Sequence, residues 1–203
     1  EKSRKQLQLF LYRRDPKSFG VFSLQGGGPR YLPLKTGTAQ TGVTAGRDFV
    51  IAFGKDFATA PVTAFQWNWK QNRWDTSPAS NPGPGYIPVL LPSPDDIGLA
   101  SNLVIAARDN YYIAALYDQS RKLLQFQLFY HDGLGTWSKS SLYSTANVTI
   151  YQDPDNAAEF PFSLSLSAAF AVATYVTAIS GTEVAYSLRI LQWDTRFNLL
   201  SPS

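Results

Sequence analysis

The sequence predicts an all-β fold, and its repeats favour a β-propeller. A similar strand-like sequence segment, here called a phrase, occurs four times. The four phrases end at Phe19, Trp74, Trp137 and Phe197, at spacings of 55, 63 and 60 residues. Short apolar runs rich in β-branched residues precede three of these phrases, and Pro- and Gly-rich stretches separate them. A period of about 60 residues made of strands is the signature of radial or stacked repetition. An ordinary β-sandwich of short strands is the alternative.

The phrases that lead to the aromatic residues predict the third strand of each unit. In Leu124-Gln-Phe-Gln-Leu-Phe129 apolar and polar residues alternate, as in a strand with two different faces. Turn-forming residues follow, Gln71-Asn72 in one unit and Asp132-Gly133-Leu134-Gly135 in another. The repeated aromatic residue then opens a fourth strand. We therefore assign Trp74 and Trp137 to packing of the scaffold.

The apolar runs predict the innermost strand of each unit, buried on both faces. They are Asp48-Phe-Val-Ile-Ala52, Asn102-Leu-Val-Ile-Ala106 and Ala169-Phe-Ala-Val-Ala173. We expect a second strand near 58–63, 111–117 and 174–179. One unit is then a blade of four strands that runs from an apolar inner strand to a polar outer one.

These units predict one β-repeat domain over residues 1–203. A half blade occupies 1–24, and complete blades occupy 43–78, 99–143 and 164–200. Linking loops occupy 25–42, 79–98 and 144–163. Three and a half blades do not close a ring, because propellers need at least about four, and open sheet edges invite association. We therefore expect a piece of a larger ring, or a chain completed or capped by other polypeptide.

Composition narrows the function classes. Hydrophobic residues make up 44% of the chain, which is a globular composition. The net charge of +3 arises in residues 1–20, so no surface of cations for nucleic acid is expected. The absence of cysteine excludes disulfides and thiolate chemistry. With no methionine the sequence does not begin at an initiator, so we expect processing or a longer protein. The apolar run 168–179 is too short to span a bilayer.

Two sets of phrases carry a family resemblance. They are Gly46-Arg-Asp-Phe-Val-Ile-Ala52 with Phe65-Gln-Trp-Asn68 and Trp74, and Leu103-Val-Ile-Ala106 with Phe129-Tyr-His-Asp-Gly133 and Trp137. These units resemble the blades of FG-GAP or VCBS-type β-propellers, which occur in integrin-like heads, fungal propeller lectins and shell subunits of bacterial toxin complexes. The resemblance covers nearly the whole chain. The calcium loop of those families, Asp-x-Asp-x-Asp-Gly, is absent from every unit, which argues against calcium in the blade loops.

Aromatic residues are the candidates for ligand binding, since they stack on sugars and form hot spots at protein interfaces. The alternative is that they pack between blades. Trp67 and Trp69 share one strand face by the two-residue period. The full candidate set is Trp67, Trp69, Tyr111, Tyr112, Tyr130 and His131.

Catalytic and metal sites are not expected. His131 is the sole histidine, it lies beside a turn, and no Gly-x-Ser-x-Gly elbow occurs, so a Ser-His-Asp triad lacks its parts. Asp153, Asp155 and Glu159 supply oxygen ligands for calcium without EF-hand spacing, so we expect neither a metal nor another cofactor. Asn147-Val-Thr149 is an acceptor triplet for N-glycosylation.

The sequence thus predicts a non-enzymatic binding or structural propeller module. It would recognise a protein or glycan partner through its inter-blade loops, because functional residues favour loops held by a rigid scaffold. The alternatives are a glycan-binding lectin, a glycoside-active propeller, and a propeller shell piece of a secreted toxin or multidomain protein. We expect an extracellular or secreted location, no nucleic-acid partner and no membrane span.

Overall fold

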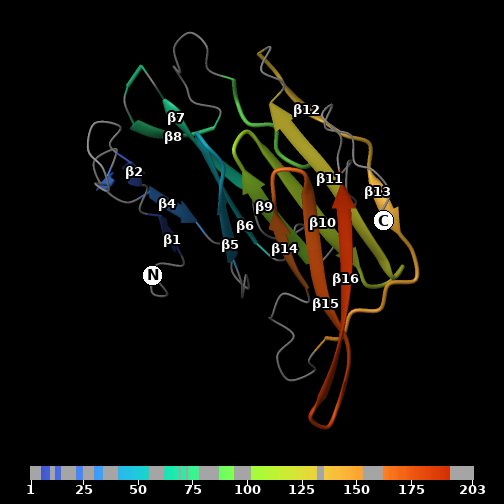
Figure 1. Ribbon diagram of the computed structural model, residues 1–203. Helices are drawn as coiled ribbons and strands as arrows, with labels where there is room; N and C mark the ends of the chain where they lie inside the picture. Colours follow the sequence, from blue (N-terminus) through green and yellow to red (C-terminus); the bar gives the residue numbers. More distant parts are fainter. Residues whose placement is uncertain are drawn as a thin grey trace.

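The computed structural model confirms the all-β class (Figure 1). Three antiparallel sheets of four, five and three strands dominate, and no helix occurs in the part of the chain that the structure describes. That part comprises residues 6–9, 12–14, 22–24, 30–33, 41–54, 62–68, 70–71, 73–77, 87–93, 102–131, 135–152 and 162–192. Two small strand pairs precede the three sheets: β1 (Gln6–Leu9) with β4 (Arg30–Pro33), and β2 (Tyr12–Arg14) with β3 (Phe22–Leu24).

In the first and third sheets, and from β9 to β12 in the second, strands that follow one another in sequence are neighbours in space. The first sheet contains β5 (Thr41–Ala45), β6 (Phe49–Gly54), β7 (Thr63–Asn68) and β8 (Arg73–Thr76). The second contains β9 (Asn102–Arg108), β10 (Tyr111–Asp118), β11 (Leu123–His131), β12 (Trp137–Lys139) and β13 (Tyr143–Thr145), both of the last two pairing with β11. The third contains β14 (Phe162–Leu166), β15 (Phe170–Ser180) and β16 (Glu183–Gln192).

The first two strands of every sheet are joined by a tight hairpin with two residues at its tip. In the first sheet the Gly46 N–H donates to the Phe49 carbonyl at 2.9 Å, and in the third the Ser167 N–H donates to the Phe170 carbonyl at 2.8 Å. In the second sheet Arg108 pairs with Tyr111. Phe49, Tyr111 and Phe170 therefore hold equivalent positions, at intervals close to the period seen in the sequence.

Successive sheets pack face to face. We call the face that carries Phe49 in the first sheet, and its equivalents Tyr111 and Phe170 in the others, the forward face. Phe49 and Ile51 share a buried cluster with Tyr112 of the second sheet. The forward face of the second sheet, with Tyr111, is buried against Ala171, Ala173 and Tyr175 of the third sheet. The second sheet is therefore covered on both faces.

The first strands of the three sheets are spatial neighbours. β9 lies beside both β5 and β14. The Ala107 N–H of β9 also donates to the Thr44 Oγ1 of β5 at 2.8 Å, which ties these two strands directly. The sheets are thus joined through their first strands as well as through their faces.

The position of the first strand differs from the prediction in two sheets. Residues 49–52 fall in the second strand of the first sheet, and residues 170–173 fall in β15, which continues through 174–179 without a break. The actual first strands, β5 and β14, begin in stretches predicted as linking loops. β14 alternates apolar and small polar residues, Phe162-Ser-Leu-Ser-Leu166, which is the pattern of a half-buried strand, whereas β5, Thr41-Gly-Val-Thr-Ala45, consists of small and polar residues around one valine. Most of the second strand expected at 58–63 lies outside the described residues.

Candidate interaction surface

Two of the predicted ligand-binding aromatics are packed inside the scaffold. Trp67 is 2% exposed and meets Trp74 edge to face, with ring centroids 5.5 Å apart. Tyr112 is fully buried and stacks on Phe129 at 4.7 Å, and its hydroxyl donates to the Leu90 carbonyl. The faces of these rings are occupied by the protein's own side chains. Trp69 lies outside the described residues.

The other aromatic candidates gather at one end of the second sheet. Tyr111 lies opposite Tyr130, and its pKa is raised above 10.0 by burial, an effect that nearby Arg108 opposes. Tyr130 and His131 are half-buried. The His131 N–H donates to the Asn110 carbonyl at 2.9 Å, and Asn110 Nδ2 donates back to the His131 carbonyl at 3.0 Å. Among the aromatic candidates that the structure describes, Tyr130 and His131 are the two that keep an exposed part.

The remaining predicted sites are placed as follows. Asn147 is exposed and has a left-handed backbone, with φ of 59°, next to buried Val148. Asp153, Asp155 and Glu159 lie outside the described residues, and within those residues no group of three His, Asp or Glu side chains could hold a metal ion. A helix long and apolar enough to cross a membrane is likewise not found there.

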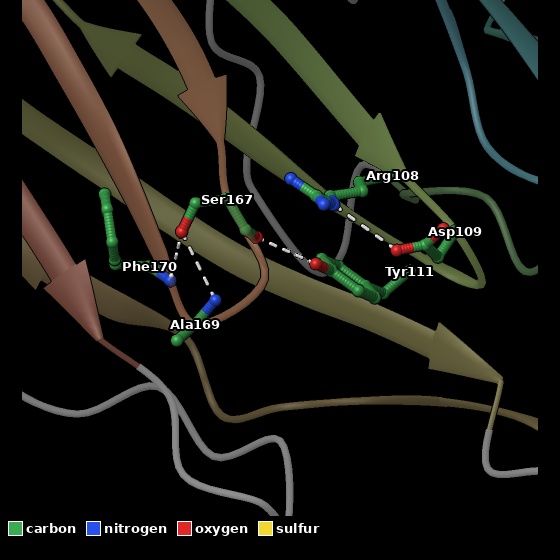
Figure 2. Close-up of polar contacts among 6 residues, drawn as sticks. All are labelled: Arg108, Asp109, Tyr111, Ser167, Ala169 and Phe170. Atoms are coloured by element: carbon green, nitrogen blue, oxygen red, sulfur yellow. Dashed lines mark hydrogen bonds and ion pairs between the residues drawn. The ribbon is translucent and has the colours of Figure 1, made fainter.

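The hairpin tips of the three sheets are hydrogen-bonded in succession. The Arg47 N–H donates to the Asp109 carbonyl, which joins the first tip to the second. The Tyr111 hydroxyl donates to the Ser167 carbonyl at 2.8 Å, which joins the second to the third (Figure 2). Within the third tip, Ser167 Oγ accepts the Phe170 N–H at 3.1 Å. These bonds hold the three tips at a fixed spacing.

One face of the third sheet carries most of the large apolar side chains that are exposed in the described residues. Four of them alternate along β16, and three of these lie across from apolar residues of β15, as in the pairs Val172–Ile190 and Ile179–Val184. Tyr186 is 70% exposed and Leu188 is 61% exposed. We call this surface the outer face, and its exposed apolar residues are Phe170, Ile179, Val184, Tyr186, Leu188 and Ile190.

The outer face is the forward face of the third sheet. Phe170 is 42% exposed, whereas its equivalents Phe49 and Tyr111 are 3% and 4% exposed. Ile190 lies across from Val172, just as the fully buried Leu128 lies across from Ile113 in the second sheet. The same apolar face thus occurs three times. A following sheet covers the first two, and the third faces solvent.

The far end of the outer face belongs to a projecting hairpin. β14 pairs with β15 as far as Tyr175, and β15 and β16 then continue together to Ser180 and Glu183 (Figure 1). Residues 178–186 are all exposed. Because a two-stranded hairpin in water is marginally stable by itself, this extension is expected to gain stability from packing against something else.

The outer face is not among the binding sites that the sequence predicts. The signal was present, because Val184, Tyr186, Leu188 and Ile190 recur at every second position. Such alternation predicts a strand with one apolar face, and an apolar face is ordinarily assigned to the core. The structure places this one outward.

No protein-family model, curated protein or solved structure matches this chain. The resemblance to FG-GAP or VCBS-type blades therefore stays a prediction.

Proposed function

We propose that this chain is a non-enzymatic structural and binding module of the β-propeller type. Its outer face binds a further β-sheet of the same repeat, carried by polypeptide outside residues 1–203. The exposed forward face of the third sheet is the observation that carries the proposal, because two equivalent faces in the same chain are each covered by a β-sheet.

The packing of the sheets supports a propeller over a sandwich. In a propeller the innermost strands of successive blades are neighbours, and each blade packs on the next. β5, β9 and β14 have that neighbour relation, and each is the first strand of its sheet. In a two-sheet sandwich each sheet buries one face and turns the other to solvent. The second sheet, buried on both faces, fits a middle blade better.

The chemistry of the outer face supports a protein partner. Soluble monomers rarely expose large contiguous apolar patches, and such patches mark interaction sites. None of the cross-strand pairs on this face contains a charged residue. The pairs are Phe170–Gln192, Val172–Ile190, Thr174–Leu188, Val176–Tyr186 and Ile179–Val184. A glycan or ionic ligand needs several convergent polar groups in its binding site, whereas the apolar face of a partner β-sheet can pack on the outer face without them. A β-sheet therefore fits the outer face better than a glycan or an ion does.

Native mass spectrometry of the protein from its natural source tests the proposal. We expect it to occur in species larger than 22.5 kDa, joined or bound to further polypeptide. An intact monomer of 22.5 kDa would contradict the proposal.

A photo-cross-linking side chain at position 188 identifies the occupant of the outer face. We expect cross-links to strands of a polypeptide segment other than β15 and β16. Cross-links from position 188 to β15 or β16 of a second copy would show a symmetric dimer and would exclude a further sheet as the occupant. Leu142, which is also exposed but lies between β12 and β13 of the second sheet, serves as the control position.

A further inference from the structure

A short extended segment, residues 87–91, is clasped between the first and second sheets. Gln66 Nε2 donates to the Ile87 carbonyl at 2.7 Å, and the Val89 N–H donates to Gln66 Oε1 at 3.2 Å. From the other side, the Tyr112 hydroxyl donates to the Leu90 carbonyl. One carboxamide therefore holds both a carbonyl and an N–H of the segment.

The side chains of the clasped segment complete this interface. Val89 is buried in the same cluster as Phe49, and Leu91 packs against that cluster. The residue between the two clasped groups is Pro88, which has no N–H to donate. Gln66 bonds to the residues on either side of it, so proline is tolerated at this position. The clasp thus selects an extended, apolar chain that needs no charge.

The third sheet repeats the phenylalanine–glutamine pair of the clasp. Gln66 pairs with Phe49, and Gln192 pairs with Phe170 at the equivalent position of the third sheet. The surrounding sequence also repeats, as Phe65-Gln-Trp-Asn68 and Leu191-Gln-Trp-Asp194. The second sheet differs, because Tyr130 pairs there with Tyr111.

A different hydrogen bond at the second sheet explains why it has tyrosine in place of the glutamine. Tyr111 reaches across to the Ser167 carbonyl, so the third sheet itself supplies the backbone partner at that interface. The first sheet has phenylalanine at this position, which lacks a hydroxyl, and it uses the glutamine to bind an inserted segment instead. The third sheet has the phenylalanine–glutamine pair of the first.

We infer that Gln192 and Phe170 form a subsite for an extended apolar segment of the polypeptide that covers the outer face. The Gln192 carboxamide donates to one backbone carbonyl of the segment and accepts the N–H two residues further on, and an apolar side chain of the segment packs against Phe170. The inference rests on the proposed function, since it names the part of the partner that contacts this end of the face.

A peptide with the sequence of residues 86–92, Tyr-Ile-Pro-Val-Leu-Leu-Pro, is the probe for this subsite. It is acetylated and amidated, and is titrated into the whole isotope-labelled chain while NMR follows the side-chain amide of Gln192 and, in every variant, the backbone amides of Phe170 and residue 192. We expect this signal to shift on titration. Gln192→Glu removes the donor and should weaken binding about tenfold, because the peptide carbonyl loses its partner. Methylation of the valine nitrogen of the peptide should weaken binding by a similar factor.

Gln119→Glu is the matched control. Gln119 lies in the exposed turn between β10 and β11 of the second sheet, at the end of β10 opposite to Tyr111 and the hairpin tip. This substitution should leave peptide binding unchanged. No shift of the Gln192 amide, or equal binding by Gln192→Glu and the unaltered chain, would overturn the inference. Mass spectrometry of the natural protein would still detect a covering polypeptide in that case, so failure of the subsite is distinguishable from failure of the proposed function.

Discussion

The hydroxyl of Tyr111 donates a 2.8 Å hydrogen bond to the backbone carbonyl of Ser167, 56 residues further along the chain. Tyr111 lies at the start of β10, and Ser167 is at the hairpin tip between β14 and β15. The Tyr111–Ser167 bond and the bond from the Arg47 N–H to the Asp109 carbonyl together link the three hairpin tips in a row. The apolar clusters hold the sheets together, and these polar bonds fix how far one sheet slides along the next.

Tyr111→Phe is expected to lower the free energy of unfolding by about 1 kcal/mol. The ring remains in the apolar cluster, while the Ser167 carbonyl loses its donor. Urea denaturation followed by tryptophan fluorescence measures the change. Tyr186→Phe is the control, because Tyr186 is largely exposed and its variant should stay within about 0.5 kcal/mol of the unaltered chain. Equal effects of the two substitutions would show that the Tyr111 hydroxyl does not stabilise the fold through its bond to Ser167.

Stability is expected to fall at alkaline pH through Tyr111. Burial raises the pKa of Tyr111 in the folded chain above 10.0, so folding favours the neutral phenol. This contribution is complete below pH 10 and is lost as pH rises through the raised pKa. Tyr111→Phe has no such group, so its stability should decline less between about pH 8 and about pH 11. Parallel declines for the two proteins would contradict the assignment.

Gly46→Ala is expected to be strongly destabilising for a steric reason. A Cβ at this position would lie 2.2 Å from the Phe49 ring and 2.6 Å from the Asp109 carbonyl oxygen. Relief of this overlap requires the first two hairpin tips to separate, at a cost of about 3 kcal/mol. Gly181→Ala has open space but a left-handed φ of 60°, and should cost about 1 kcal/mol. Chemical denaturation of both variants checks this order, and a harmless Gly46→Ala would mean that the tips are not in contact.

Trp67→Ala distinguishes a scaffold role from glycan recognition. Trp67 is buried against Trp74, so its truncation should cost about 4 kcal/mol of stability. A binding tryptophan would lose its ligand with little change in stability. Thermal unfolding and a glycan array on the same variant separate the two roles. An unchanged melting temperature together with loss of a bound glycan would favour the lectin alternative.

Local signals in the sequence predicted much of the fold. Trp74 and Trp137 lie at the start of β8 and β12, as the repeated phrases indicated. Alternation and turn residues identify strands locally, so the third strands were found correctly. The first strands β5 and β14 were missed, because the composition of short Gly- or Ser-containing strands resembles that of loops. Such strands are recognised by the neighbouring strands to which they are hydrogen-bonded, and this pairing is visible only in the folded structure.

The candidate surface was harder to predict. Tyr111 and Tyr112 are adjacent and identical in chemistry, yet they lie on opposite faces of the second sheet, in two different clusters. Alternation separates the faces of a strand but does not say which neighbour covers each face. The outer face has the composition of a core, and its exposure follows from the arrangement of the sheets rather than from its own sequence.

Gln66→Ala is expected to release the clasped segment between the first two sheets. The Val89 N–H donates to Gln66 Oε1 and also to Ser77 Oγ, so its hydrogen exchange should accelerate by about tenfold when the carboxamide is removed. Gln125→Ala is the control, because Gln125 bonds to Ser144 on the second sheet. Exchange of the Val89 N–H is measured by NMR. If it were unchanged in Gln66→Ala, Tyr112 and the apolar cluster alone would hold the segment. Gln192 would then have no precedent in the chain for binding an extended partner.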